Sequence, residues 1–363
     1  HDDGSRAKKV SFVTDIEGNW EYFVRFVERC EALRFEGGAP AFDERSGAAV
    51  VLEEGWCFVH GGDACDKGGV VGGSIRVVQT LCRLKRRYPD RVVLLLGNRD
   101  LNKLRMTSEL QAGGPLYRRQ LVDGPPWVPA GKRVSPELFL RRRVAEAYGC
   151  APEAVPEAAV DAADTLPNRI RWMYKETMGA DGEFERQWAE LALLRRVRRE
   201  ALSEEEVAAA ILRSVLPGGG MRELLELGQL AFLHAGVLFV HGGLIGGAWE
   251  GSEGGVHCYG YVPGRDERLE GAVEWVHALN EWKQAQFAEW IRQPYWRLPA
   301  DGGAPSRGGE AIMAYVCPGC VPSVVMGRHL DRKGMPLPLP PPLAAALRRG
   351  GVSKLAVGHT PHG

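Results

Sequence analysis

The sequence has no long hydrophobic run and no excess of either charge. No apolar run reaches the ~20 residues that a membrane-spanning helix needs, so no membrane partner is expected. Lys plus Arg and Asp plus Glu both number 46, so no overall charge attracts nucleic acid or an acidic membrane. The basic clusters at 85–87 and 141–143 are interpreted as solvated helix faces. A nucleic acid partner is therefore not favoured.

Cysteines are also few and scattered. A chain of 363 residues with eight separated cysteines needs no disulfide framework, which favours reduced thiols in a cytosol-like compartment. Cys317 and Cys320 form the one close pair. A structural zinc would need two more ligands, so we interpret the pair as a turn with two bystander thiols, with a redox or metal role as the alternative. No signal peptide is visible, and the first residues resemble a trimmed or tag-derived start.

The composition is typical of a globular protein, with 45% hydrophobic and 25% charged residues, and the length allows one large domain with insertions or two domains. Apolar runs predict strands at 10–14, 58–60, 92–96, 238–241, 324–326 and 355–357. Helical periodicity predicts helices at 20–33, 73–88, 269–292 and 343–349. Asn19 is a candidate N-cap for the first of these helices.

The stretch 101–235 differs from its flanks because its pattern is mostly helical. Separate helices are predicted at 136–148, 168–178, 183–198 and 203–216, and Ser203 with Glu206 fits a capping box. We interpret this stretch as a helical insertion or cap. It divides the chain into a first part of the core (1–100), the insertion (101–235) and a second part of the core (236–363).

Five short polar segments stand out along the chain. They are Asp15-Ile16-Glu17-Gly18, Gly62-Asp63-Ala64-Cys65-Asp66-Lys67-Gly68, Gly97-Asn98-Arg99-Asp100, Val240-His241-Gly242-Gly243 and Gly358-His359-Thr360-Pro361. At least three follow a strand-like apolar run, and open α/β sheets place ligands at the carboxyl ends of their strands. Oxygen and imidazole ligands gathered there can hold one or two divalent metals.

Each segment alone also has an ordinary structural explanation. Taken alone, Asp15 at a strand end is better explained as an N-cap, Asp63 as a turn residue, and His241 as a satisfied histidine in a packed loop. The combination and order of the five segments are more specific than any one of them. A carboxylate pair is followed by Gly-Asp, Gly-Asn and two separated histidines, each beside a glycine.

This order resembles the calcineurin-like metallophosphoesterases, and more narrowly the branch of phosphoprotein phosphatases and diadenosine-tetraphosphatase-like enzymes. The family pattern is DxHG, GDxxDRG, GNHE or GNHD, HGG and GHT. The resemblance implies a four-layer α/β sandwich of two packed sheets flanked by helices, here with a helical insertion. It also implies a metal-dependent phosphoesterase that hydrolyses a phosphate monoester or a phosphoprotein with a water activated between two divalent metals.

The resemblance assigns roles to particular residues. Asp63 would bridge the two metals, and the other metal ligands would be Asp15, Glu17, Asn98, His241 and His359. Phosphate contacts would come from Lys67 and Arg99, and the catalytic residues would be Arg99 and Asp66. Arg328 is a further candidate phosphate contact from its position in the sequence, with an ordinary surface arginine as the favoured alternative. The partner implied is a phosphorylated protein or small molecule.

Glu17 departs from the family pattern, which has a metal-binding histidine there. A first metal site of Asp15, Glu17 and Asp63 is all carboxylate, which favours Mn or Mg over Zn or Fe. The alternative is a weakened or empty site. His362 is a candidate replacement ligand, and a histidine in a surface turn is the equal alternative.

Arg99 is the second departure, because the family has a histidine there that is thought to protonate the leaving group. Arginine cannot act as a general acid, since its pKa is above ~12. Arg99 would instead clamp a phosphoryl oxygen, or pair with Asp66 or Asp100 and replace a metal with its own charge. Lys67, where the family has Arg, keeps a point charge without the planar fork.

Both departures also fit a second function, a catalytically impaired pseudophosphatase that acts as a scaffold or binding protein. The helical insertion would then offer a surface to a protein partner. A nucleic-acid phosphodiesterase is a weaker third hypothesis, because no basic stripe stands out. The family usually continues into further strands, so two alternatives are open: the native chain extends past Gly363, or this protein lacks that tail.

Overall fold

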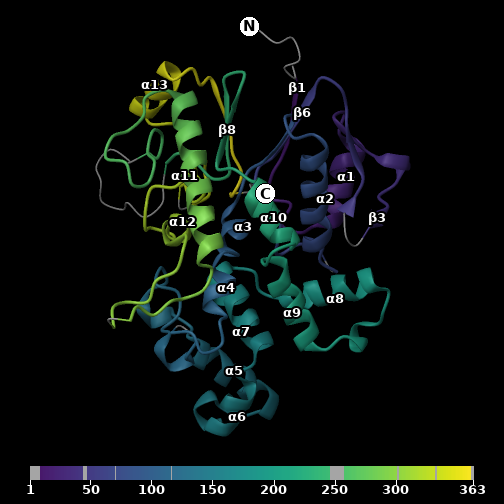
Figure 1. Ribbon diagram of the computed structural model, residues 1–363, viewed down its shortest axis with the longest axis vertical. Helices are drawn as coiled ribbons and strands as arrows, with labels where there is room; N and C mark the ends of the chain where they lie inside the picture. Colours follow the sequence, from purple (N-terminus) through teal and green to yellow (C-terminus); the bar gives the residue numbers. More distant parts are fainter. Residues whose placement is uncertain are drawn as a thin grey trace.

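Two three-stranded sheets form the centre of the upper half of the molecule (Figure 1). The computed structural model describes residues 9–43, 47–69, 71–115, 117–245, 257–300, 302–331 and 333–360. In the first sheet, β1 (Lys9–Val13), β6 (Trp56–His60) and β7 (Val92–Leu94) are all parallel. In the second, β10 (Lys354–Ala356) runs parallel to β9 (Val237–Val240), and β8 (Ala231–His234) pairs antiparallel with β9.

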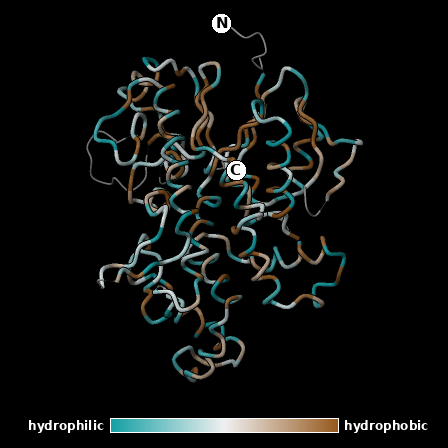
Figure 2. Tube along the Cα trace, viewed as in Figure 1, coloured by the Kyte–Doolittle hydropathy of each residue, from teal (hydrophilic) through white to brown (hydrophobic). Residues whose placement is uncertain are grey.

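The two sheets pack against each other through a small apolar cluster. Its buried members come from strands of both sheets and the residue after β7, and they are Cys57, Val59, Val93, Leu95 and Phe239. The rings of Phe12 and Phe239 lie 5.6 Å apart across this cluster. Figure 2 shows these strands as brown, hydrophobic segments. Strands buried on both faces read as continuous apolar runs, which is why 10–14 and 92–96 predicted them.

Helices cover the outer sides of the sheets. On the first sheet lie α1 (Trp20–Arg29) and α2 (Ser74–Arg87), and α11 (Ala272–Arg292) runs beside β8 on the second (Figure 1). The predicted cap of α1 is confirmed, since the Asn19 side chain accepts a hydrogen bond of 2.9 Å from the Tyr22 amide. The remaining elements of these parts are β2 (Leu33–Phe35), β3 (Phe42–Asp43), β4 (Gly47–Ala48), β5 (Val50–Leu52), α12 (Glu310–Tyr315) and α13 (Pro341–Arg349).

Most of the stretch 101–235 forms the helical lower half of the molecule, and its last strand, β8, lies in the upper half as part of the second sheet (Figure 1). The Ser203–Glu206 capping box is confirmed at the start of its helix. The predicted helix 168–178 instead changes to a π-helical turn, η5 (Met173–Thr177). The α-helices between β7 and β8 are α3 (Asn98–Asn102), α4 (Arg105–Glu109), α5 (Pro136–Tyr148), α6 (Glu157–Ala163), α7 (Leu166–Trp172), α8 (Glu183–Arg195), α9 (Glu204–Ser214) and α10 (Gly220–Leu227).

Two buried glutamates of α8 attach this helical part to α2. The Glu190 carboxylate accepts hydrogen bonds of 3.0 Å from the amides of Ile75 and Arg76. Glu183 accepts one of 2.7 Å from the Ser74 hydroxyl. These amides lie in the first turn of α2, where no intrahelical acceptor exists and a negative charge is favourable. The attachment fixes the helical part beside the second polar segment, which leads into α2.

The predicted strand at 324–326 is wrong, because these residues form a turn. The apolar residues Val324 and Val325 are fully buried, although they lie in a turn. The Val324 carbonyl accepts a hydrogen bond of 2.7 Å from the Gly242 amide. The first helix is also shorter than predicted, since the chain becomes extended at Cys30. The two central sheets have three strands each, and β2–β5 and β3–β4 form two further two-stranded sheets, so the described residues show small sheets where the four-layer family fold implies two large ones.

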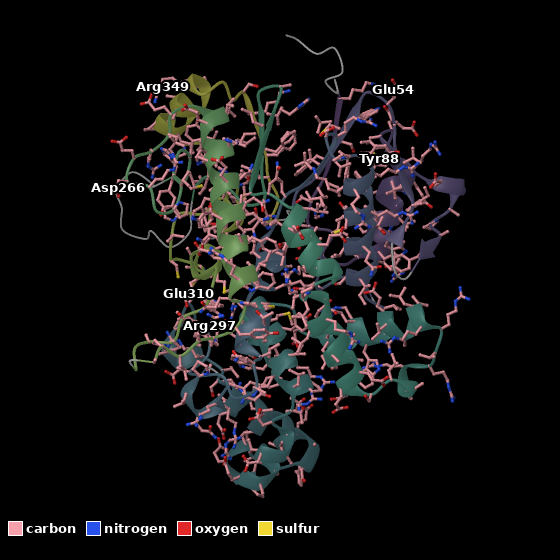
Figure 3. The ribbon with its side chains drawn as sticks, in the orientation of Figure 1. Glu54, Tyr88, Asp266, Arg297, Glu310 and Arg349 are labelled. Atoms are coloured by element: carbon pink, nitrogen blue, oxygen red, sulfur yellow. The ribbon has the colours of Figure 1, made fainter. Side chains whose placement is uncertain are left out.

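No described helix is long and apolar enough to cross a membrane. Charged side chains such as Glu54, Asp266 and Arg349 lie at the outline of the molecule (Figure 3). The cysteines are free thiols, and the sulfur atoms of Cys317 and Cys320 lie 2.6 Å apart in the predicted turn.

Lys283 of α11 is a buried lysine, and we predict that it makes stability depend on pH. Its ammonium contacts the carbonyls of Leu225 and Glu226 at the end of α10. Burial lowers the pKa of Lys283 from 10.5 to about 7. Between these values the unfolded chain binds a proton that the folded chain does not, so stability rises with pH across this window.

The variant Lys283→Met should remove this dependence. Wild-type protein should gain stability relative to the variant as the pH rises from about 7 to about 10, in urea unfolding measured at several pH values. Parallel pH profiles for the two proteins would contradict the assignment.

Candidate metal centre

The five polar segments all lie at the carboxyl ends of strands. Asp15 and Asp63 follow β1 and β6, Asn98 follows β7, and His241 and His359 follow β9 and β10. Within each sheet these strands are parallel, so their ends meet at one edge. The strand ends of each sheet are where open α/β sheets bind ligands.

Three of the predicted ligands form a buried cluster. Ligand atoms of Asp63, His241 and His359 all lie within 4.8 Å of one another, and no other such group occurs among the described residues. His241 Nε2 lies 3.4 Å from Asp63 Oδ1 and 3.3 Å from Asn98 Oδ1. Two ligands at about 2.1 Å from one ion are about 3.0–3.4 Å apart along an edge of an octahedron or tetrahedron. The two distances from His241 therefore fit neighbouring ligands of one divalent ion.

The ring orientation of His241 is set by its other nitrogen. Nδ1 lies 2.9 Å from the Gly61 carbonyl, which accepts its proton and leaves the Nε2 lone pair for a metal. Gly62 permits this approach, because a Cβ there would lie 2.6 Å from Nδ1. Burial alone would lower the pKa of His241, but Asp63 and Asp15 raise it to about 9. Without a metal, the carboxylates therefore favour a cation at this ring.

His359 supplies an unused donor atom. Its Nε2 is buried and has no hydrogen-bond partner among the described residues. Burial and the neighbouring His241 lower the pKa of His359 to about 3, so the ring is neutral. A buried polar atom without a partner costs free energy unless a ligand satisfies it. A metal ion held with Asp63 and His241 would satisfy it.

The Asp63 carboxylate is held in the charged state. Burial opposes ionisation, but His241 and Arg99 hold the pKa of Asp63 well below its usual range. The loop around it is fixed by Asp100, whose carboxylate accepts hydrogen bonds of 2.9, 3.0 and 2.8 Å from the amides of Asp63, Ala64 and Gly97. The sequence predicts for Asp100 only an ion pair with Arg99, although its position two residues after Asn98 places it in the third segment.

The backbone at these segments is unusual. Six of the eight positive-φ residues other than glycine in the described chain belong to the site segments. They are Asp15 (+52°), Glu17 (+49°), Asp63 (+54°), Asp66 (+74°), Lys67 (+63°) and His359 (+66°). Such conformations cost about 1–3 kcal/mol each and cluster at functional sites.

The carboxylates of Asp15 and Glu17, which are predicted to bind the first metal, form hydrogen bonds or ion pairs with other residues of the protein. Asp15 accepts hydrogen bonds from the Thr14 hydroxyl at 2.6 Å and the His359 amide at 3.0 Å, so it positions the fifth segment. Glu17 accepts one of 2.9 Å from Arg99 Nε and lies 3.9 Å from Lys67 Nζ. Neither carboxylate joins the cluster of Asp63, His241 and His359. Their role as metal ligands stays a prediction.

Arg99 does not form the ion pairs expected with Asp66 or Asp100. Its Nε lies 2.9 Å from Glu17 Oε1 and 3.4 Å from Asp63 Oδ2. Asp66 pairs instead with Lys103 at 2.6 Å, deep beneath the loop. This pair gives Asp66 a structural contact, and its catalytic role stays a prediction.

Lys67 and Arg328 border the centre at the surface. Lys67 lines a hollow of about 630 Å³ whose wall also includes Asp15, Glu17 and Tyr22. Arg328 is exposed, and its charge is one cause of the lowered pKa of His359, which places it near that ring. Both positions suit contacts to an anionic substrate. His362 lies outside the described residues.

Gly97 lies in close contact with Asp63, where a larger residue would not fit. We predict that Gly97→Ala weakens metal binding by about 10–100-fold, the usual effect of losing a contact that supports a metal ligand. An added Cβ would lie 2.0 Å from Asp63 Oδ1 and 2.4 Å from the Asp63 amide nitrogen. Titration with Mn would measure the dissociation constant. Gly131→Ala is the control, because a Cβ there meets nothing within 4 Å. Equal affinities of the two variants would contradict this packing argument.

Comparison with known proteins found no similar protein. No family model matches the chain, no curated protein matches it, and no solved structure matches it. The resemblance stated above therefore depends on the five segments, and the functional argument depends on the geometry of the centre.

Proposed function

We propose that this protein is a metal-dependent phosphoesterase of the calcineurin-like kind, acting on a phosphate monoester or a phosphoprotein. The observation that supports it most is the buried group of Asp63, His241 and His359 at the carboxyl ends of strands from both sheets. Two packed sheets with helices on their outer sides are compatible with a small version of the four-layer sandwich.

The ion would be held by Asp63, His241 and His359, with the Asn98 side-chain oxygen as a further ligand. A bound divalent ion lowers the pKa of a coordinated water toward 7 and polarises a phosphoryl oxygen. Lys67 and Arg328 would bind phosphoryl oxygens from the surface side of the centre. Arg99 Nη2 makes no hydrogen bond to the described residues, so it is free to donate one to the phosphate.

Arg99 stays protonated and cannot supply a proton to the leaving group. General acid catalysis is typically worth ~10²–10⁴ in rate, and its loss matters least for leaving groups that depart as stable anions. Aryl phosphates should therefore be hydrolysed faster than alkyl phosphates.

The proposal is tested with metal-stripped protein, an aryl phosphate and added Mn, Mg or Zn. Phosphate release that requires the metal is the expected result. No release with any of these ions, although the protein binds one of them, would contradict the proposed activity.

A scaffold without catalysis is the second candidate, and the Glu17–Arg99 ion pair favours it because it occupies a carboxylate of the predicted first metal site. A protein partner at the helical part would be expected in that case. Failure to bind any divalent ion in titration would support the scaffold and overturn the phosphoesterase.

A further inference from the structure

We propose that this centre binds a single divalent ion, and that the guanidinium of Arg99 takes the position and the charge of a second one. The inference depends on the proposed function only in requiring the metal site of Asp63, His241 and His359. It replaces the expectation of two metals with one metal and one built-in organic cation.

The contacts of Arg99 are those of a cation held between carboxylates. Nε lies 2.9 Å from Glu17 Oε1 and 3.4 Å from Asp63 Oδ2, while Asp63 Oδ1 lies on the other side, 3.4 Å from His241 Nε2. Asp63 therefore has one oxygen toward the histidines and one toward the guanidinium. A bridging carboxylate in a two-metal site divides its oxygens between two cations in the same way.

Arg99 is also fixed from the helical part of the molecule. Nη1 donates hydrogen bonds of 3.3 Å to the carbonyls of Met178 and Gly179, directly after the π-helical turn η5. The side chain is 8% exposed, so the charge is largely removed from water. Interior π-helical turns frequently occur at functional sites. Four acceptors thus hold the guanidinium, and the side chain is not free to swing away for an incoming ion.

The carboxylates near Arg99 have little capacity left for a second ion. Glu17 already has Arg99 at 2.9 Å and Lys67 at 3.9 Å, and both Asp15 oxygens accept from the His359 amide. A divalent ion placed among them would lie beside the buried Arg99 guanidinium, which would repel it, with the half-exposed Lys67 ammonium also nearby.

The inference changes the expected metal. The all-carboxylate site was the reason to favour Mn or Mg, and Arg99 now occupies part of it. The remaining donors are two imidazoles, one carboxylate and one amide oxygen, a set that suits Zn, Fe or Mn better than Mg. The substrate phosphate would then meet one metal and the remaining Nη2 donors of Arg99, so a dianionic phosphate monoester should bind better than a singly charged diester.

Metal counting on purified full-length protein tests the inference. After equilibrium dialysis against Mn, and separately against Zn, the metal per chain is measured by elemental analysis for wild type, Arg99→Gln and a control. Wild type should bind one ion, and Arg99→Gln should bind two, because Glu17 and Asp63 Oδ2 become available. Arg34→Gln is the control, since Arg34 forms an exposed ion pair with Glu53, and it should bind one.

Glu17→Gln provides a second, independent readout in case Arg99→Gln does not fold. In this inference Glu17 contacts Arg99 and does not bind the metal. Removing the charge of Glu17 should therefore change the Mn dissociation constant by less than about 3-fold. If Glu17 were itself a ligand, the loss should exceed about 10-fold.

Each outcome has one meaning. Two ions in wild type, one ion in both wild type and Arg99→Gln, or a large loss of affinity in Glu17→Gln would each overturn the single-ion inference and leave the phosphoesterase standing. No ion in wild type would instead overturn the proposed function.

Discussion

Replacing Asp63 by Asn is expected to lower kcat/KM for an aryl phosphate by about 10³-fold or more, since a metal-derived stabilisation of several kcal/mol is lost. The Asp63 carboxylate lies 3.4 Å from His241 Nε2 and 3.4 Å from Arg99 Nε. Its charge would therefore stabilise both the metal ion proposed beside His241 and the Arg99 guanidinium. An amide keeps the shape and removes the charge. Steady-state kinetics with saturating Mn measure the effect.

The matched control is Asp90→Asn, at an exposed position outside the polar segments. It should keep wild-type kinetics and wild-type metal content. If Asp63→Asn retained activity within about tenfold of wild type, Asp63 would not be a ligand of the reacting centre. Circular dichroism of both variants separates loss of chemistry from loss of fold.

Lys103→Met is expected to lower the free energy of unfolding by about 3–5 kcal/mol, the usual cost of removing one partner from a buried ion pair. Lys103 Nζ lies 2.6 Å from Asp66 Oδ2, and the two side chains are 3% and 0% exposed. Burial opposes the charge of Lys103, but Asp66 raises its pKa above the ordinary value. The variant would leave the buried Asp66 carboxyl without its ion-pair partner. Urea unfolding at neutral pH measures the loss.

Two further variants give this stability prediction its controls. Lys132→Met, at an exposed lysine, should change stability by less than about 0.5 kcal/mol. The double variant Asp66→Asn with Lys103→Met should recover part of the loss, because neither charge remains. A Lys103→Met variant as stable as wild type would show that this ion pair contributes nothing to holding the second segment.

The sequence predicts the core of the fold well where local signals are strong. Buried strands read as apolar runs, and the helix starts at Trp20 and Glu204 are marked by Asn19 and Ser203, whose side chains accept hydrogen bonds from the backbone. The strand prediction at 324–326 is wrong because burial in a turn gives the same apolar signal as a strand.

The sequence predicts where the site lies better than it predicts which side chains contact one another there. Segment order and strand ends place Asp63, His241 and His359 together, because parallel strands end at one edge. The partner of a long charged side chain depends on tertiary structure. Arg99 reaches Glu17 and carbonyls that lie about 80 positions away in sequence, and Lys103 resembles any helical lysine until its burial is known.

Glu183 and Glu190 illustrate the same limit. In the sequence they are acidic residues of a predicted helix with no signal for burial, yet both are buried and accept hydrogen bonds at the start of α2. Only the docking of the helical part on the core gives them that role. Charge patterns along one helix do not contain this information.

Anomalous diffraction from crystals grown with Mn tests the central claim most directly. The account predicts one strong anomalous peak within coordination distance of Asp63, His241 and His359, with the Arg99 guanidinium next to Glu17. A peak bound by Glu17 and Asp15 with Arg99 displaced, or no peak near His241 and His359 at saturating Mn, would contradict it.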